Sequence, residues 1–357
     1  MSTTAPQQQQ QRIAALLDQV GALTRENAAM RALSAAAQQE QPLFRFGVIA
    51  DVQYCDIPDG ASFDGATKRY FRGALDCLHK AVAEWAAPGS GVSFVAQLGD
   101  IIDNQCQANK QTAADFGAVM GALEPLARRS VRLYNCIGNH ELYNFSRAEL
   151  ASGPLRTVGP AGVEYYAFRP APGWCFLVLD PYQEAIIGWA PGSAQHEHAL
   201  AKLRAHNPND VLGACDWGAG LAGDARRWVP YNGGLGAAQL AWMRAELQAA
   251  TAAAERVVML SHVLLHPAAA GGTTMAWDFD EAAAAMEGLE GCVAAVLCGH
   301  DHVGGYVRDA KTGIHHVTFQ SPLNCGSSDM CHATVEVFAD RLSIRGRGIV
   351  PSRELQL

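Results

Sequence analysis

The chain has 357 residues and a formal net charge of −8, with 49% hydrophobic and 17% charged residues. A chain of this length and composition folds into one large or two ordinary globular domains, so a largely disordered protein is excluded. The acidic balance argues against a dedicated nucleic-acid-binding protein, because phosphate backbones select clusters of Lys and Arg.

The N-terminal 41 residues differ in character from the rest of the chain. A run of glutamines is followed by a segment rich in Ala, Leu, Gln and Arg, whose apolar residues alternate in steps of three and four. This spacing is typical of an a/d heptad seam, with Asn27 at one a position. Residues 1–41 are therefore interpreted as a helical extension, either a short coiled coil that forms a homodimer or a single amphipathic helix. The seam consists of Ile13, Leu16, Val20, Leu23, Asn27 and Met30.

Neither a secretory signal nor a membrane-spanning segment is predicted. The N-terminus lacks a basic region and an apolar run, and no apolar run approaches the roughly 18 residues of a membrane-spanning helix. The ten cysteines form no Cys-x-x-Cys pair. In a chain long enough to bury a core, such cysteines are expected to be free thiols, which favours a reducing compartment and a cytoplasmic location.

From residue 42 onward, the sequence has the pattern of an α/β domain, 42–357. Helical spacing covers residues 68–85 and 113–124, and Pro125 is expected to stop the second helix. Residues 188–236, rich in Gly, Pro and Trp, are interpreted as long surface loops with one short helix near 195–205. Strands are predicted, in chain order, over residues 44–50, 92–98, 131–137, 175–179, 257–260, 292–297, 315–319, 333–338 and 341–345.

Polar clusters follow five of these strands. Because ligand sites in α/β sheets gather at the carboxyl ends of strands, the clusters should meet in one place. Their carboxylates, amides and imidazoles are too many for one ion and suit two hard or borderline ions that share a bridging carboxylate. The clusters are Asp51-Val52-Gln53, Gly99-Asp100-Ile101-Ile102-Asp103, Gly138-Asn139-His140-Glu141, Ser261-His262 and Gly299-His300-Asp301-His302.

These clusters resemble the motifs of the calcineurin-like metallophosphoesterase superfamily, which read D-x-H, G-D-x-x-D, G-N-H-D/E, a lone His and G-H-x-H. The chain departs from them at Gln53, where the superfamily has His. That departure resembles the manganese-dependent ADP-ribose/CDP-alcohol diphosphatase branch. Strings elsewhere fit the same branch: Gly138-Asn-His-Glu-Leu-Tyr-Asn-Phe-Ser-Arg147, His206-Asn-Pro-Asn209, Tyr231-Asn-Gly-Gly234, Gly304-Gly-Tyr306 and Gly346-Arg-Gly-Ile-Val-Pro351.

The resemblance implies a fold and a set of site residues. The expected fold is a four-layer αββα sandwich with two mixed sheets. The expected catalytic pair is His140, a general acid, and Asp103, which orients it. The amide oxygen of Gln53 should favour Mn²⁺ over Zn²⁺, so the expected cofactors are two divalent ions, most simply Mn²⁺. Their ligands by resemblance are Asp51, Gln53, Asp100, Asn139, His262, His300 and His302.

The expected substrate is a small nucleotide, with no nucleic-acid or membrane partner. Phe63 is a candidate for stacking on a nucleobase and Arg69 for holding a phosphate, while Tyr143 and Asn144 lie close to the expected site. By resemblance, the reaction is hydrolysis of a phosphoanhydride in ADP-ribose or CDP-choline. Two alternatives stay open: a phosphodiesterase or phosphomonoesterase of the same superfamily, and a non-catalytic scaffold with a degenerate site.

Overall fold

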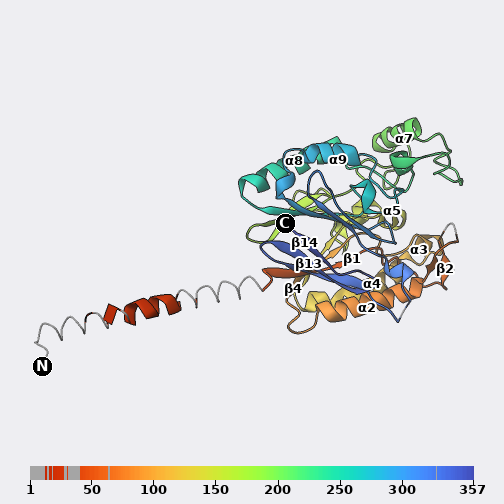
Figure 1. Ribbon diagram of the computed structural model, residues 1–357. Helices are drawn as coiled ribbons and strands as arrows, with labels where there is room; N and C mark the ends of the chain where they lie inside the picture. The colour runs from red at the N-terminus through yellow and green to blue at the C-terminus, as the bar shows by residue number, and fades with distance from the viewer. Residues whose placement is uncertain are drawn as a thin grey trace, which may run out of the picture.

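Two six-stranded mixed sheets form the centre of the molecule, and helices cover their outer faces (Figure 1). The structure is a computed structural model that describes residues 13, 16–17, 19–27, 30, 41–62, 65–326 and 328–357. The four layers agree with the αββα sandwich expected from the sequence.

The first sheet has the strand order β14-β13-β12-β1-β4-β5. Strand β1 pairs in parallel with β4 and antiparallel with β12, so the carboxyl ends of β1, β4 and β5 lie at one edge. The strands are β1 Phe44–Ile49, β4 Val92–Gln97, β5 Arg132–Asn135, β12 Cys331–Val337, β13 Arg341–Gly348 and β14 Arg353–Gln356.

The second sheet has the order β10-β11-β9-β8-β7-β6. Strands β7, β8, β9 and β11 are parallel, and the edge strands β6 and β10 are antiparallel to their neighbours. The strands are β6 Tyr166–Ala171, β7 Trp174–Val178, β8 Arg256–Ser261, β9 Val293–Cys298, β10 Gly305–Arg308 and β11 His315–Thr318. A separate ribbon pairs β2 Gly60–Ala61 with β3 Lys68–Arg69.

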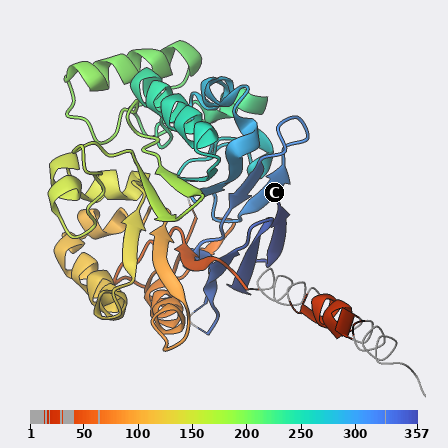
Figure 2. The same ribbon diagram turned by 90° about the vertical axis from the view of Figure 1, so that its left-hand side faces the viewer.

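The helices α2 and α4 lie on the outer face of the first sheet, and α8 and α9 lie on that of the second (Figures 1 and 2). Beyond the N-terminal seam, the α-helices of the described residues are α2 Phe71–Trp85, α3 Gln105–Ala108, α4 Thr112–Arg128, α5 Asn139–Asn144, α6 Arg147–Ser152, α7 Ala194–His206, α8 Gly236–Ala252 and α9 Phe279–Met286. Short 3-10 turns are η1 Gly223–Arg227, η2 Pro267–Ala269, η3 Glu290–Cys292 and η4 Pro322–Asn324.

An aromatic cluster joins the two sheets. The ring of Phe46 in β1 stacks on Phe94 in β4 at 5.0 Å and meets Phe176 of the opposite sheet edge-on at 5.3 Å. On the other face of β1, Gly47 lies under the Trp85 indole of α2, where an added Cβ would come within 2.5 Å of the ring. The strand is therefore buried on both faces, as its almost continuous apolar sequence predicts.

Helix α4 corrects one prediction, because Pro125 does not stop it. The helix continues through Pro125 to Arg128. A proline within a helix leaves the carbonyl four residues earlier without its hydrogen bond. Here that carbonyl belongs to Gly121, which is exposed, so water can satisfy it.

The segment 188–236 is only partly the set of surface loops that was predicted. Helix α7 forms where it was expected, but Asn207 and Asn232 are buried. The side-chain amide of Asn207 donates hydrogen bonds to the carbonyls of Trp217 and Trp228. Buried amides thus give this irregular segment an internal framework.

The described residues of the N-terminal seam are helical, and their apolar side chains are exposed, with 52–59% of their surface accessible. In both views this helix lies apart from the sheets (Figures 1 and 2). The boundary at residue 42 stays a prediction. None of the helices in the described part of the chain has the length and hydropathy needed to cross a bilayer.

Candidate active site

The predicted ligands meet at the carboxyl ends of β1, β4, β8 and β9 and at the start of α5. Four of them have left-handed backbone conformations: φ is 51° at Asp51, 44° at Gln53, 59° at Asp100 and 67° at His300. Such conformations cost about 1–3 kcal/mol each in a residue with a side chain. The rest of the fold must therefore stabilise these turns, which direct several polar groups into one space.

Two glycines allow the ligand loops to approach each other. A Cβ on Gly138 would lie 2.1 Å from Asp100 Oδ1, and a Cβ on Gly99 would lie 2.5 Å from His262 Nδ1. Both distances are shorter than the van der Waals contacts that real Cβ atoms make. The Gly-Asp and Gly-Asn-His motifs thus need glycine because the neighbouring ligand occupies the place of a side chain.

One half of the site consists of Asp51, Gln53, Asp100 and His302. The Gln53 amide nitrogen lies 3.0 Å from both Asp100 Oδ2 and His302 Nε2, and Asp51 Oδ1 lies 3.5 Å from His302 Nε2. Asp51 Oδ1 and Gln53 Oε1 are buried and have no hydrogen-bond partner among the described residues. A hard divalent cation would use these two buried oxygens and the neighbouring imidazole nitrogen as ligands, and would so satisfy both oxygens.

The other half consists of Asp100, Asn139, His262 and His300. His262 Nε2 lies 3.3 Å from both Asp100 Oδ2 and Asn139 Oδ1. Ligand atoms of Asp100, His262 and His300 all lie within 4.8 Å of one another. Asp100 thus contacts both halves, as a bridging carboxylate should.

The charged groups of this cluster shift one another's pKa values. Burial alone would raise the pKa of Asp100, but the His262 and His140 imidazoles outweigh it and hold that pKa well below its usual range. Burial lowers the pKa of His262, yet the Asp100 carboxylate outweighs burial and raises it to about 9. Burial, together with the charge of His262, lowers the pKa of His300 well below its usual value. Among these three groups, only His262 therefore holds an extra proton at neutral pH, and the Asp100 carboxylate and the His300 ring are left without one.

His140 lies beside the ligands at the start of α5, with Nε2 3.8 Å from Asp100 Oδ2. Its Nδ1 accepts a hydrogen bond from the backbone N–H of Asn104 at 2.8 Å. Asp103 Oδ2 is 3.5 Å from the same nitrogen and is buried, with no hydrogen-bond partner within the described ranges. The predicted pair of His140 and Asp103 is therefore close, but the hydrogen bond to His140 Nδ1 comes from the backbone N–H of Asn104, the residue after Asp103.

The predicted substrate contacts have different surroundings. The Tyr143 ring meets His140 edge-on at 5.5 Å. The amide of Asn144 donates to the carbonyls of Asp103 and His140 and accepts from Thr112, so it braces the loops around His140. Arg69 lies in β3, with its Nε buried and unpartnered in the described part of the chain. Phe63 lies outside the described residues. All four substrate roles stay predictions.

Several residues that the sequence did not single out support the site. Glu141 accepts hydrogen bonds from the backbone N–H groups of Asp100, Ile101 and Gly138. The Tyr182 hydroxyl lies 3.2 Å from Asn139 Oδ1, and Ser321 donates to the Asp51 carbonyl. The Asn232 side chain accepts from His300. Two of them had a sequence signal: Glu141 lies in the Gly-Asn-His-Glu string and Asn232 in the Tyr231-Asn-Gly-Gly234 string.

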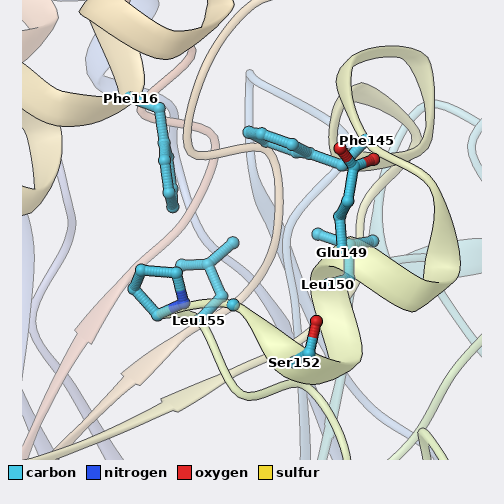
Figure 3. Close-up of a pocket in the computed structure, with 8 residues that line it drawn as sticks. Phe116, Phe145, Glu149, Leu150, Ser152 and Leu155 are labelled. Atoms are coloured by element: carbon cyan, nitrogen blue, oxygen red, sulfur yellow. The ribbon is translucent and has the colours of Figure 1, made fainter.

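A separate apolar pocket lies at the C-terminal end of α5, where Phe145 follows the helix. It has a volume of about 250 Å³, and its lining includes Phe145 and Phe116 of α4, whose rings meet edge-on at 5.0 Å (Figure 3). Glu149 and Ser152 of α6 contribute polar atoms at its rim. None of the predicted ligands lines this pocket, so the polar cluster at the strand ends is the candidate active site.

The comparisons with known proteins agree on one family. The family model for calcineurin-like phosphoesterases matches residues 44–304. The chain is 36% identical to a manganese-dependent ADP-ribose/CDP-alcohol diphosphatase of Oryza sativa subsp. japonica, over 89% of this chain and 96% of that protein. It is 34% identical to the protein of the same name from Homo sapiens, over 89% and 94%. A solved structure of a dimetal phosphatase from Danio rerio matches with a TM-score of 0.81 and 34% identity, over 88% of this chain and 99% of that chain.

Proposed function

The chain belongs to the calcineurin-like phosphoesterase family, and we propose that it is a manganese-dependent diphosphatase acting on ADP-ribose and CDP-alcohols. The observation that carries the proposal is the meeting of seven O and N donors at the strand ends, with Gln53 among them. The names of the relatives supply the substrate class.

The proposed reaction is hydrolysis of the phosphoanhydride between the two phosphorus atoms. ADP-ribose would yield AMP and ribose 5-phosphate, and CDP-choline would yield CMP and phosphocholine. The oxygen of water joins one phosphorus, while the bridging oxygen leaves with the other and takes up a proton. The enzyme must therefore neutralise phosphate charge and supply that proton.

The chain's own residues account for where two cations would be held. Asp51, Gln53, Asp100 and His302 would hold one, and Asp100, Asn139, His262 and His300 the other. When bound, two divalent ions supply neutralisation of phosphate charge and a lowered pKa for water. For Gln53 to take part, its amide would turn so that the unpartnered Oε1 faces the cation in place of the nitrogen.

We assign proton donation to the leaving oxygen to His140. Because its Nδ1 accepts from the Asn104 N–H, the neutral ring carries its proton on Nε2, on the side of Asp100. For Nε2 to act as the acid, Nδ1 must carry a second proton, which would displace the Asn104 N–H and donate a hydrogen bond to Asp103 Oδ2, 3.5 Å away. Transfer of the Nε2 proton to the leaving oxygen then returns the ring to its neutral form. A positioned acid of this kind contributes about 10²–10⁴-fold to the rate.

A substrate panel tests the proposal and separates it from its rivals. ADP-ribose, CDP-choline, a cyclic nucleotide and a phosphomonoester are incubated with the full chain, with and without Mn²⁺, and products are identified by phosphorus NMR. We expect Mn²⁺-dependent cleavage of the first two and none in the matched Asn139→Ala protein. Preferred cleavage of the cyclic nucleotide or monoester would favour the rival activities, and inactivity on all four would favour a scaffold.

We further propose that the N-terminal helix pairs with a second copy of the chain and that the protein works in the cytoplasm. The apolar seam supports the first proposal, because Ile13, Leu16, Val20, Leu23 and Met30 are exposed in the part of the chain that the structure describes. The ten free cysteines, nearly all buried, support the second.

A further inference from the structure

Asn232 contacts a predicted cation ligand from outside the ligand set. It lies in the irregular segment after η1, has no exposed surface, and places Oδ1 2.7 Å from His300 Nε2. The two residues are 68 positions apart in the chain. The contact is therefore a product of the tertiary fold.

The orientation of the Asn232 amide is fixed by its other hydrogen bonds. Its nitrogen donates to the carbonyl of Arg227 at 2.9 Å and to the carbonyl of Thr273 at 2.8 Å. Turning the amide over would place its oxygen against two carbonyl oxygens and leave both without a donor. The oxygen must therefore face His300, so His300 Nε2 carries the proton and donates it.

This hydrogen bond determines which nitrogen of His300 is free. With Nε2 as the donor, the lone pair of the neutral ring lies on Nδ1, and the His262 ring lies 4.7 Å away. His262 has the opposite arrangement, because its Nδ1 lies 2.7 Å from the Leu98 carbonyl and its Nε2 faces Asp100. The two imidazoles are thus held in place by an amide oxygen and a backbone carbonyl respectively.

We propose that Asn232 is a positioning residue that holds His300 in the tautomer with a free Nδ1 and directs that nitrogen toward a divalent cation. The proposal rests on the metal-dependent function above. Partners of this kind fix the ring and raise the basicity of a ligand, and their loss typically weakens metal affinity about 10–100-fold. The long segment 188–236, which has little regular structure, thereby becomes part of the metal site.

Two substitutions separate positioning from simple anchoring of the loop. Asn232→Asp keeps an oxygen for His300 but loses both donors to Arg227 and Thr273. Asn232→Leu loses the oxygen and the donors together. As a matched control, Asn209→Leu removes an amide that donates to the carbonyls of Trp217 and Ala219 in the same segment.

The binding of Mn²⁺ to the full chain is measured directly from the EPR signal of the free ion. Circular dichroism checks that each variant is folded. We expect Asn232→Leu to lower the affinity of one site about 10–100-fold. Asn209→Leu should stay close to wild type, and Asn232→Asp should lose less affinity than Asn232→Leu, because it keeps the oxygen for His300 although its second oxygen faces two carbonyls. Wild-type affinity in Asn232→Leu, or equal losses in the Leu and Asp variants, would overturn the proposal.

A second readout keeps this test separate from the proposed function. Nitrogen-15 NMR of the metal-free protein reports which ring nitrogen of His300 is protonated. We expect Nε2 protonation in wild type and a mixture of tautomers in Asn232→Leu. If wild type binds no Mn²⁺, the proposed function fails, and the tautomer alone decides: the same tautomer in both proteins would overturn the role of Asn232.

Discussion

Glu141 provides the sharpest prediction about how the site is built. Its carboxylate is fully buried and accepts three backbone hydrogen bonds, at 2.7 Å from Asp100 N, 2.7 Å from Ile101 N and 2.8 Å from Gly138 N. These donors belong to the loops after β4 and β5. One side chain therefore holds the Asp100 and Asn139 loops together.

The expected cost follows from the number of donors left unsatisfied. Glu141→Leu fills much of the same space but leaves three buried N–H groups without an acceptor, at about 1–3 kcal/mol each. The total of about 3–9 kcal/mol is comparable with the roughly 5–15 kcal/mol of a typical domain. Glu141→Gln keeps an oxygen for two of the donors, so it should lose about 1.5–3 kcal/mol, the usual worth of a hydrogen bond to a charged group.

Urea unfolding in the presence of a chelator measures these costs without a contribution from bound metal. Glu149→Gln is the matched control, because Glu149 caps α6 in a similar way but is exposed. Its loss should be below about 1 kcal/mol. If Glu141→Leu is as stable as this control, the clamp does not contribute to stability and the reasoning is wrong.

Three further predictions concern the reaction, the cations and the N-terminus. His140→Ala should lower kcat about 10²–10⁴-fold while Mn²⁺ binding, measured by EPR, is unchanged; loss of one ion would make His140 a ligand. Since the Asp100 carboxylate, against burial, raises the pKa of His262 to about 9, a cation must displace a proton below that pH. Mn²⁺ affinity should therefore rise from pH 7 toward 9, and calorimetry in two buffers that detects no proton release at pH 7 would contradict this. Removal of residues 1–41 should give an active monomer in light scattering, and an inactive product would place the domain boundary elsewhere.

Each cluster of predicted ligands follows an apolar strand, and the carboxyl ends of parallel strands share one edge of a sheet. Sequence could therefore place Asp51 near Asp100, and His262 near His300, without any coordinates. The packing of the two sheets then brings the two edges together, since β1 and β4 belong to one sheet and β8 and β9 to the other. It could not show that Asn104 rather than Asp103 holds His140 Nδ1, because that choice depends on the angle of one turn.

The missed elements have physical reasons as well. Helix α8 was not predicted, because its alanine-rich sequence has no clear polar face to give a 3.6-residue period. Proline generally ends helices, but helix α4 tolerates Pro125 because the Gly121 carbonyl that loses its hydrogen bond is exposed to water. Asn232 lies in a segment without periodicity, and its role depends on a partner 68 residues away.

The central claim is that the strand-end residues form a two-cation site bridged by Asp100. Anomalous diffraction from crystals grown with Mn²⁺ tests it most directly. We expect two peaks, one among Asp51, Gln53, Asp100 and His302 and the other among Asp100, Asn139, His262 and His300. A single peak, peaks away from these residues, or a peak coordinated by His140 would contradict it.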